Sequence, residues 1–221
     1  MTRQKVLILG NKNYYNFKLD NIIDSFDVIY RCNLARPGEN NGTKFGKLAM
    51  CGHVYQNFVL KPLSKEQAVD LYKTDYIDTF VSDWYDFFQE NKENFDEIFH
   101  QDEHNWGEWN RMLEEYGSPN RFSKMATTGY STIFRNLAEG DNKVYVSGFK
   151  KIYEAEQSIY YDEAHYDTIY RDEIKILNWL HNNKKVDASL CMLEDVEEPT
   201  LKTNVCNTEP SEFILDLLNK G

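Results

Sequence analysis

Positive charge and long apolar runs are what this sequence has little of. Lys and Arg number 25 against 36 Asp and Glu, so the formal net charge is −11. This balance disfavours a nucleic-acid partner, because binding to the phosphate backbone needs a basic face. The N-terminal apolar run, Val6–Leu9, is far too short for a signal-peptide core or a membrane span. We therefore expect a cytoplasmic protein without a transmembrane segment, and peripheral association with the inner membrane surface is the alternative.

Cysteines are few, and known cofactor motifs are missing. Cys32, Cys51, Cys191 and Cys206 show neither Cys-x-x-Cys spacing nor a metal-like pairing with histidine. Since no export signal precedes them, we expect reduced thiols, and a disulfide is the less favoured alternative. Neither G-x-G-x-x-G nor a P-loop occurs, so dinucleotide and ATP chemistry find no support.

What the sequence does contain is typical of a folded globular chain. Hydrophobic residues make up 41% and charged residues 28%, and 15 Tyr and 13 Phe are too many for a disordered chain. A length of 221 residues suits one domain with a sizeable core. We expect a single domain over residues 1–221, in which residues 75–120 are a candidate helical lid or acceptor-site insertion.

The first 55 residues have the pattern of strand, loop, helix and strand. The run Val6–Leu9 ends at Gly10 and predicts a buried strand that leads into a ligand loop. Apolar residues with helical spacing predict a short helix over Leu19–Ile23. Further strands are predicted over Asp27–Tyr30 and within Leu48–Tyr55.

The rest of the chain continues this alternation. Asp75–Tyr116 is rich in Trp and acidic residues and is predicted to be mostly helical. Alternating strands and helices predict an α/β fold, a single Rossmann-like domain with a mostly parallel sheet flanked by helices. Ligands of such sheets bind at the carboxyl ends of the strands. Other helices are predicted after the capping box at Ser64 and over Thr127–Leu137, Ile169–Leu180 and Phe213–Leu218, and other strands over Lys143–Ser147 and Ala188–Leu193.

Polar residues follow the first two predicted strands. The first loop begins Gly10-Asn11-Lys12-Asn13, where a glycine lets the backbone approach a ligand and amides can point at a phosphate. An ordinary strand-to-helix turn would use the same residues, so this segment alone leaves both interpretations open. Arg31 and Asn33 lie just beyond the second predicted strand, and they would lie beside the first loop if the two strands are neighbours. Arg31 is then either a local cation for a ligand or a structural ion-pair partner.

The order of these residues resembles a known motif. Gly10-Asn11, followed by the segment Ile23–Val28 and then by Arg31 and Asn33, resembles the long sialylmotif of sialyltransferases of glycosyltransferase family 29. The tripeptide Arg31-Cys32-Asn33 is also similar to the bacterial sialyltransferases of family 42.

Two later regions extend the resemblance. Ala126–Tyr130, followed by Val144–Phe149, is similar to the short sialylmotif, in which a Ser/Thr-Gly helix entrance precedes a V-Y-x-x-G-F strand. Tyr160-Tyr161-Asp162 resembles the Y-Y-D element of the family. His165, with Glu173 after it, resembles the very short motif, in which a His precedes a Glu. Each motif is degenerate, and it is their order that makes the resemblance specific.

The resemblance implies roles for individual residues. A sialyltransferase-like variant of the fold would use His165 as general base, because neutral imidazole suits this role near neutral pH. The donor would be a CMP-activated acidic sugar, with no metal and no cofactor besides. Contacts to the nucleotide are implied for Gly10, Asn11, Asn33, Thr127, Thr128, Gly129, Tyr160 and Tyr161, and further contacts are candidates at Lys12, Arg31, Asn57 and Glu173.

The sequence also departs from the family. The first loop continues Lys12-Asn13-Tyr14 where the family has a second glycine and a serine, and the usual His-x4-Glu spacing would put the acid at Tyr170. The membrane anchor of the eukaryotic members and the disulfide that joins their long and short motifs are missing. These differences favour a bacterial or viral type of relative.

A pair of histidines offers a metal site as an alternative feature. His100 and His104 have acids between them and would lie one turn apart on a helix, so they could chelate a divalent ion. The segment lacks the H-E-x-x-H order and an evident third ligand, and we expect no metal there.

The sequence therefore predicts an inverting, metal-independent transferase that moves a sialic-acid-like residue from a CMP-sugar to a glycan hydroxyl. A CMP-sugar hydrolase and an inactive nucleotide-sugar binding module are the alternatives.

Overall fold

The structure is a computed structural model. It describes residues 3–10, 19–32, 42–44, 46–51, 76–79, 98–100, 105–123, 126–149, 163–192 and 212–219.

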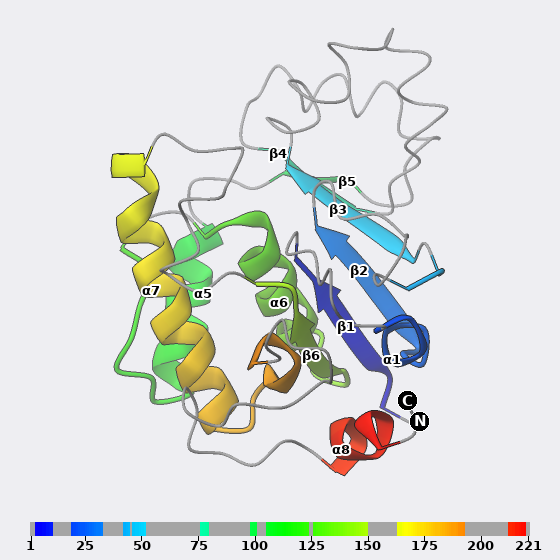
Figure 1. Cartoon of the computed structure of the whole chain (residues 1–221). Coiled ribbons are helices and arrows are strands. Elements are labelled where there is room, and N and C mark those ends of the chain that lie inside the picture. Colours follow the sequence, from blue (N-terminus) through cyan, green and yellow to red (C-terminus); the bar gives the residue numbers. More distant parts are fainter. Residues whose placement is uncertain are drawn as a thin grey trace, which may run out of the picture.

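A parallel β-sheet forms the centre of the molecule (Figure 1). Within the described ranges it has six strands in the order β5-β4-β3-β2-β1-β6, and every neighbouring pair is parallel. The strands are β1 (Lys5–Leu9), β2 (Val28–Cys32), β3 (Lys47–Cys51), β4 (Tyr76–Thr79), β5 (Ile98–His100) and β6 (Lys143–Ser147).

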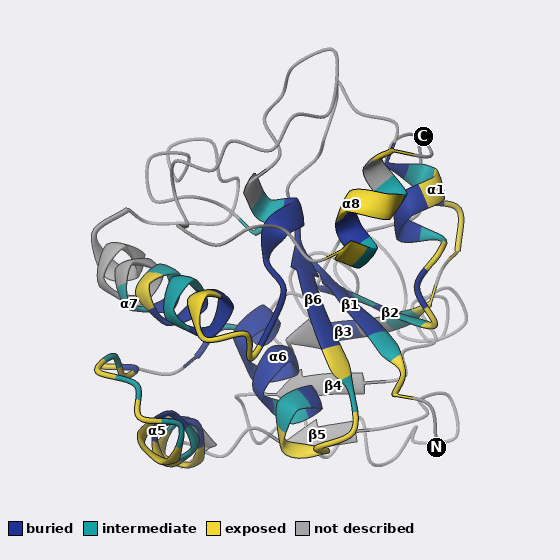
Figure 2. Ribbon diagram, turned by 90° about the horizontal axis from the view of Figure 1, so that it is seen from below, coloured by how far each residue is buried: buried dark blue, intermediate teal, exposed yellow. Residues whose placement is uncertain are grey.

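Helices cover both faces of this sheet, as the alternation of apolar residues requires. Val6 and Ile8 of β1 belong to one core cluster, and Leu7 and Leu9 belong to the other, because successive side chains of a strand point to opposite faces. Figures 1 and 2 show α5, α6 and α7 on the first face and α1 and α8 on the second. The helices are α1 (Asp20–Ile23), α5 (Asn105–Glu115), α6 (Thr128–Ala138), α7 (Glu163–Asn182) and α8 (Glu212–Leu218), with a 3₁₀-helix, η4 (Ser189–Met192).

The connections create a switch point beside β1. From β1 to β5 each strand is added on the same side, whereas the chain then returns to place β6 on the other side of β1. Ligands of open α/β sheets bind in the crevice outside the carboxyl ends of the strands at such a point. The ends of β1 and β6 are therefore the first place to look for a site.

The predicted α/β class with a parallel sheet is confirmed, and most predicted elements lie where expected. Two differences from the prediction stand out. Within Asp75–Tyr116 the described residues form strands β4 and β5 besides helix α5, so two strands of the sheet were missed there, and the other residues of this segment lie outside the described ranges. The described part of the predicted strand Ala188–Leu193, residues 188–192, does not form a strand. Asp187 makes one isolated bridge to Tyr145 of β6, and the chain then turns into η4.

Two further expectations concern cysteines and membranes. Cys32 and Cys191 form no disulfide with each other, and the side chains of Cys51 and Cys206 lie outside the described residues, so the expected reduced state of the four cysteines stays a prediction. Of the helices that the structure describes, none combines the length and the apolar character needed to cross a membrane.

Candidate functional site

Two glycines meet at the switch point. Gly10 follows β1 and donates its N–H to the carbonyl of Ser147 at the end of β6, at 2.8 Å. A Cβ on Gly10 would lie 2.4 Å from the carbonyl oxygen of Gly148, and a Cβ on Gly148 would lie 2.8 Å from that of Gly10. Gly148 also has a φ of +72°, in the left-handed region that favours glycine. The backbones of the two strand ends thus touch, which only glycine at both positions permits.

The N-terminus of α6 opens at the same edge of the sheet. Gly129, in its first turn, lies where a Cβ would be 2.6 Å from the ring of Phe149, and 3.7 Å from Sγ of Cys32 at the end of β2. The first intrahelical bond runs from the Ser131 N–H to the Thr127 carbonyl, at 2.9 Å. Helix geometry leaves the preceding amides without an intrahelical acceptor, and such amides favour anions.

Glu173 of α7 is hydrogen-bonded to the residue that precedes α6. Glu173 is 1% exposed, its carboxyl group accepts the Thr127 N–H at 2.6 Å, and the Thr127 hydroxyl bonds to it as well. Burial raises the pKa of Glu173 to about 8, although the bonds from Thr127 oppose this shift. Thr127 makes no side-chain cap to its own helix, so Glu173 takes over the role of a cap. Its sequence-predicted role as a nucleotide contact stays a prediction.

His165 lies in the first turn of α7, eight residues before Glu173. A helix rises 1.5 Å per residue, so the two backbone positions are about 12 Å apart along the axis. Figure 1 shows α7 beginning at the end of the molecule toward which the strand arrows point. The side chain of His165 lies outside the described residues, and its role as general base remains a prediction.

Several other predicted contacts also fall outside the described residues. Asn11 and Lys12 come directly after Gly10 in the sequence, and Asn33 comes directly after Cys32. Asn57, Tyr160 and Tyr161 belong to longer undescribed segments. Their contacts with a nucleotide stay predictions.

Arg31 has a structural environment. It is fully buried on the face of the sheet that carries Ile29, and its Nε and Nη2 donate to the carbonyl of Lys44 at 3.2 and 2.6 Å. Burial lowers the pKa of Arg31 to about 10, and the charge of Asp24 opposes the shift. Asp24 in turn accepts the N–H groups of Thr43 and Lys44. These bonds anchor residues 42–44 against the core, which favours the structural interpretation of Arg31.

Sequence reasoning left Gly148 and Phe149 out of the site residues. Phe149 is half-buried between Gly10 and Gly129, and its ring packs edge-on against Tyr130 with centroids 5.6 Å apart. The signal that could have found them is the glycine at the end of a second strand, because a ligand crevice needs close backbone approach from both neighbouring strands.

Metal-ligating side chains do not gather in the part of the chain that the structure describes. No group of His, Cys, Asp and Glu there is arranged to hold a metal. His100 ends strand β5, so the helical spacing assumed for His100 and His104 does not apply. The expected absence of a metal stays a prediction.

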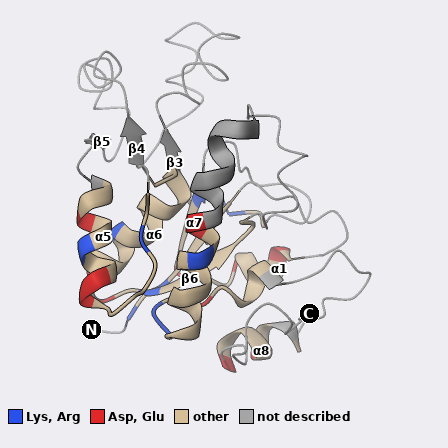
Figure 3. Cartoon of the chain, turned by 90° about the vertical axis from the view of Figure 1, so that its left-hand side faces the viewer, with Lys and Arg blue, Asp and Glu red and all other residues tan. Residues whose placement is uncertain are grey.

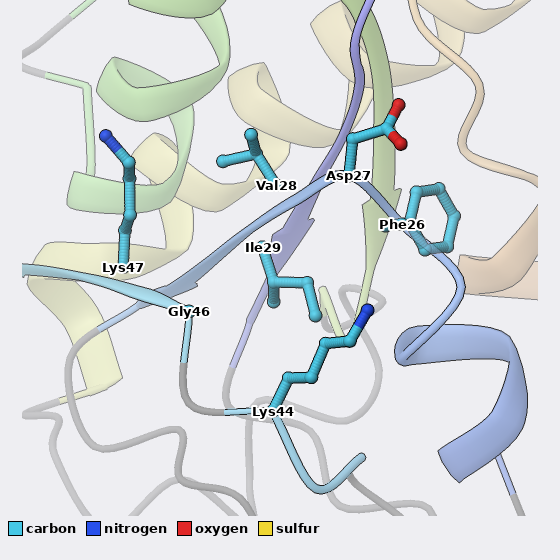
Figure 4. A pocket seen from close by; sticks show the side chains of 7 residues that line it. All are labelled: Phe26, Asp27, Val28, Ile29, Lys44, Gly46 and Lys47. Atoms are coloured by element: carbon cyan, nitrogen blue, oxygen red, sulfur yellow. The ribbon is translucent and has the colours of Figure 1, made fainter.

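A hollow lies at the opposite end of the strands, beside the amino ends of β2 and β3 (Figure 4). Lys44 and Lys47 border it, with Asp27 at its far end. Along α5 one basic residue, Arg111, lies between acidic residues, as the blue and red segments of this helix in Figure 3 show. Neither feature adjoins the switch point. The hollow is lined by Phe26, Asp27, Val28, Ile29, Lys44, Gly46 and Lys47.

Comparison with known proteins gives similarity to solved structures alone. No protein-family model and no curated protein matches the chain. The sialyltransferase CstII from Campylobacter jejuni in complex with CMP is similar at 19% identity, over 85% of this chain and 79% of that one, with a TM-score of 0.48. A variant of this sialyltransferase with CMP gives 18% identity, 83% and 79% coverage and a TM-score of 0.49. The complex of sialyltransferase CST-II with a trisaccharide acceptor and CMP is similar at 17% identity, over 83% of this chain and 79% of that one, with a TM-score of 0.46. These TM-scores lie below 0.5, so function has to be inferred from this chain's own residues.

Proposed function

We propose that the chain is an inverting glycosyltransferase that moves a sialic-acid-like, 2-keto sugar acid residue from a CMP-sugar to a glycan hydroxyl without a metal ion. The observation that supports this is the convergence of segments that resemble sialylmotifs. Gly10 and Cys32 of the long-motif region, and Gly129 and Phe149 of the short-motif region, meet at the switch point of the sheet. The two regions are far apart in the sequence, and composition alone gives no reason for them to converge there.

The site offers suitable chemistry for the nucleotide. The first-turn amides of α6 can donate to the phosphate or ribose of CMP, and the glycine pair leaves room for close backbone approach. Asn11 and Asn33 follow the ends of β1 and β2 and would add side-chain amides. Tyr160 and Tyr161 would donate to a phosphate oxygen in place of a metal ion.

The reaction is a displacement at the anomeric carbon of the donor sugar. The acceptor oxygen forms a bond to this carbon while the bond to the CMP phosphate oxygen breaks, so the configuration inverts and CMP leaves with the electron pair. His165 takes the proton of the acceptor hydroxyl.

Binding without transfer is the second candidate, and a specific departure favours it. The loop after Gly10 lacks the second glycine and the serine of the family, and Glu173 is engaged in capping α6. A nucleotide-sugar binding module would keep the CMP site and lose turnover. A hydrolase would use water in place of the glycan hydroxyl. The cytoplasmic location expected from the sequence stays a prediction.

Ligand screening tests the donor assignment first. CMP at a hundred times its Kd should stabilise the native state by about 2.7 kcal/mol and raise Tm accordingly. UDP, GDP and NAD should have little effect at equal concentration. A clear shift with UDP or NAD and none with CMP would refute the assignment.

The transfer step is tested with His165→Ala. We expect turnover to fall about 10²–10⁴-fold while the Kd for CMP changes only a few-fold, because the base faces the acceptor. Lys175→Ala, on the exposed side of the same helix, is the matched control. His181 is unsuitable as a control, since it is buried and its Nδ1 accepts the Ala188 N–H at 3.0 Å. Excess chelator should leave the rate unchanged, and near-normal transfer by the folded His165→Ala protein would remove this residue from the mechanism.

A further inference from the structure

Glu173 occupies an unusual place for a buried acid. It reaches from α7 to the N-cap residue of α6, 46 residues earlier in the sequence, and its carboxyl accepts both the N–H and the hydroxyl bond of Thr127. The first-turn amides of α6 begin at the next residue. They lie within one helical turn, about 5 Å, of the bonded Thr127 nitrogen.

The surroundings of this carboxyl contain other acids. Within the described residues, the charged group that shifts its pKa is Asp172 on the same helix, and it disfavours the ionised form. Tyr130 of α6 packs nearby, and Glu173 and Cys191 of η4 are among the causes that raise the Tyr130 pKa. Among the described residues, Thr127 is the hydrogen-bond partner that stabilises an ionised Glu173, whereas a neutral Glu173 avoids both burial of charge and repulsion by Asp172.

A phosphate bound at the first turn of α6 would add a second negative charge beside the first. Two anions at one buried helix end repel each other strongly, and a proton on Glu173 relieves this repulsion. By linkage, a ligand that binds the protein better when Glu173 is protonated must raise the proton affinity of Glu173 by the same factor.

We propose that Glu173 is a positioning residue that holds the first turn of α6 through Thr127 and that couples CMP binding at this turn to the uptake of one proton. This inference rests on the proposed function, because it takes CMP as the ligand. Glu173 touches neither donor nor acceptor in this role, and it acts through the backbone of α6.

Calorimetric titration of the whole chain with CMP tests the coupling. With a pKa of about 8 for the free protein, the wild-type Kd should rise about tenfold between pH 7 and pH 9. The second pKa of the CMP phosphate is about 6, so the nucleotide itself changes little in this interval. At pH 8, comparison of two buffers with different ionisation enthalpies should show uptake of about half a proton per CMP bound.

Two variants separate this coupling from a structural effect. Glu173→Gln keeps an oxygen that accepts the Thr127 N–H and cannot ionise, so its Kd should stay constant from pH 7 to pH 9 and its proton uptake should vanish. Asp172→Asn is the matched control, because Asp172 is the neighbouring acid and bonds to Ser123 instead of α6. It should keep a Kd that rises with pH, with the rise moved to lower pH, because Asp172 no longer raises the pKa of Glu173.

The outcomes distinguish this inference from the proposed function. CMP binding with a Kd that is independent of pH in the wild type overturns the proton coupling and leaves the donor assignment intact. No CMP binding at pH 7 overturns the donor assignment, and the coupling with it. If Glu173→Gln does not fold, the carbon-13 signal of the Glu173 carboxyl in the wild type gives the same decision: its titration midpoint must rise when CMP is added, and an unchanged midpoint refutes the inference.

Discussion

Replacement of Gly10 by alanine would test the switch point directly. The added Cβ would lie 2.4 Å from the Gly148 carbonyl oxygen and 2.8 Å from its carbon, whereas real Cβ atoms essentially never approach closer than 3.0 Å. Both neighbours are backbone atoms, so no side chain can rotate away. Gly148 has a φ of +72° and follows directly on the β1–β6 ladder, which restricts how it can move.

The expected cost combines strain with a lost bond. Overpacking in a well-packed region costs about 1–3 kcal/mol, and separation of the strand ends also weakens the Gly10 N–H bond to Ser147, which contributes about 1 kcal/mol. Gly10→Ala should therefore lower the free energy of unfolding by about 2–4 kcal/mol. CMP binding should weaken as well, because the carboxyl ends of β1 and β6, where we propose that CMP binds, would be displaced.

Urea denaturation provides the measurement, with calorimetry for CMP. The midpoint should fall with an unchanged m-value, as for a simple loss of stability. Gly107→Ala is the matched control: Gly107 is exposed on α5, and an added Cβ there would meet nothing within 4 Å, so alanine should stabilise the helix by about 0.5–1 kcal/mol. Gly10→Ala with wild-type stability and wild-type CMP affinity would refute the close contact of the strand ends.

Three further predictions concern residues around the site. Gly129→Ala should keep the fold within about 1 kcal/mol, because the added methyl meets the tip of the Phe149 side chain and no backbone atom, yet it should weaken CMP binding in calorimetry. Arg31→Met should lower stability in urea by about 1–3 kcal/mol, because its bonds to Lys44 are lost, and CMP affinity should change only a few-fold. Glu173 has a raised folded-state pKa, so its contribution to stability is greatest below about pH 4.5 and falls until about pH 8. The total loss over this interval is about 5 kcal/mol, and Glu173→Gln should flatten the profile of urea midpoints against pH.

The sequence predicted best those elements whose apolar residues are contiguous or regularly spaced. β6 was predicted with its observed bounds, Lys143–Ser147, since four of its five residues are buried. For α7, apolar spacing predicted Ile169–Leu180, whereas the helix spans Glu163–Asn182. Periodicity marks the part of a helix with an apolar stripe, and the polar first turns carry no such signal.

The missed elements depend on contacts that a local pattern does not contain. β4 and β5 are strands of four and three residues that exist by pairing along the sheet edge, and tertiary pairing overrides weak local preference. After Asp187, side chains accept the backbone N–H groups that a strand would pair with its neighbour. Asp187 accepts the Ser189 N–H at 3.0 Å, and His181 accepts the Ala188 N–H. Such local bonds compete with a β-ladder.

In the candidate site, too, local features could be predicted from the sequence and long-range contacts could not. Glycines at strand ends and a Thr-Thr-Gly helix entrance were visible in the sequence, because they are local requirements of backbone geometry. The bond between Glu173 and Thr127 joins residues 46 positions apart. Sequence resemblance assigned Glu173 to the nucleotide, and only the packing of α7 against α6 reveals its contact with the helix entrance.

The residues of the first loop can be divided into those that the fold requires and those that concern only the proposed function. Gly10 matches the motif that the sequence resembles, and its contact with Gly148 shows that the fold itself needs both glycines, whether or not a ligand is bound. The altered residues begin after it, at Lys12, which lies outside the described residues. A transferase and a binding module would therefore share the glycine pair and the α6 entrance, and they would differ at His165 and in the loop after Gly10. Loss of CMP affinity in Gly10→Ala is expected for both, whereas loss of turnover in His165→Ala at constant CMP affinity is expected for the transferase alone.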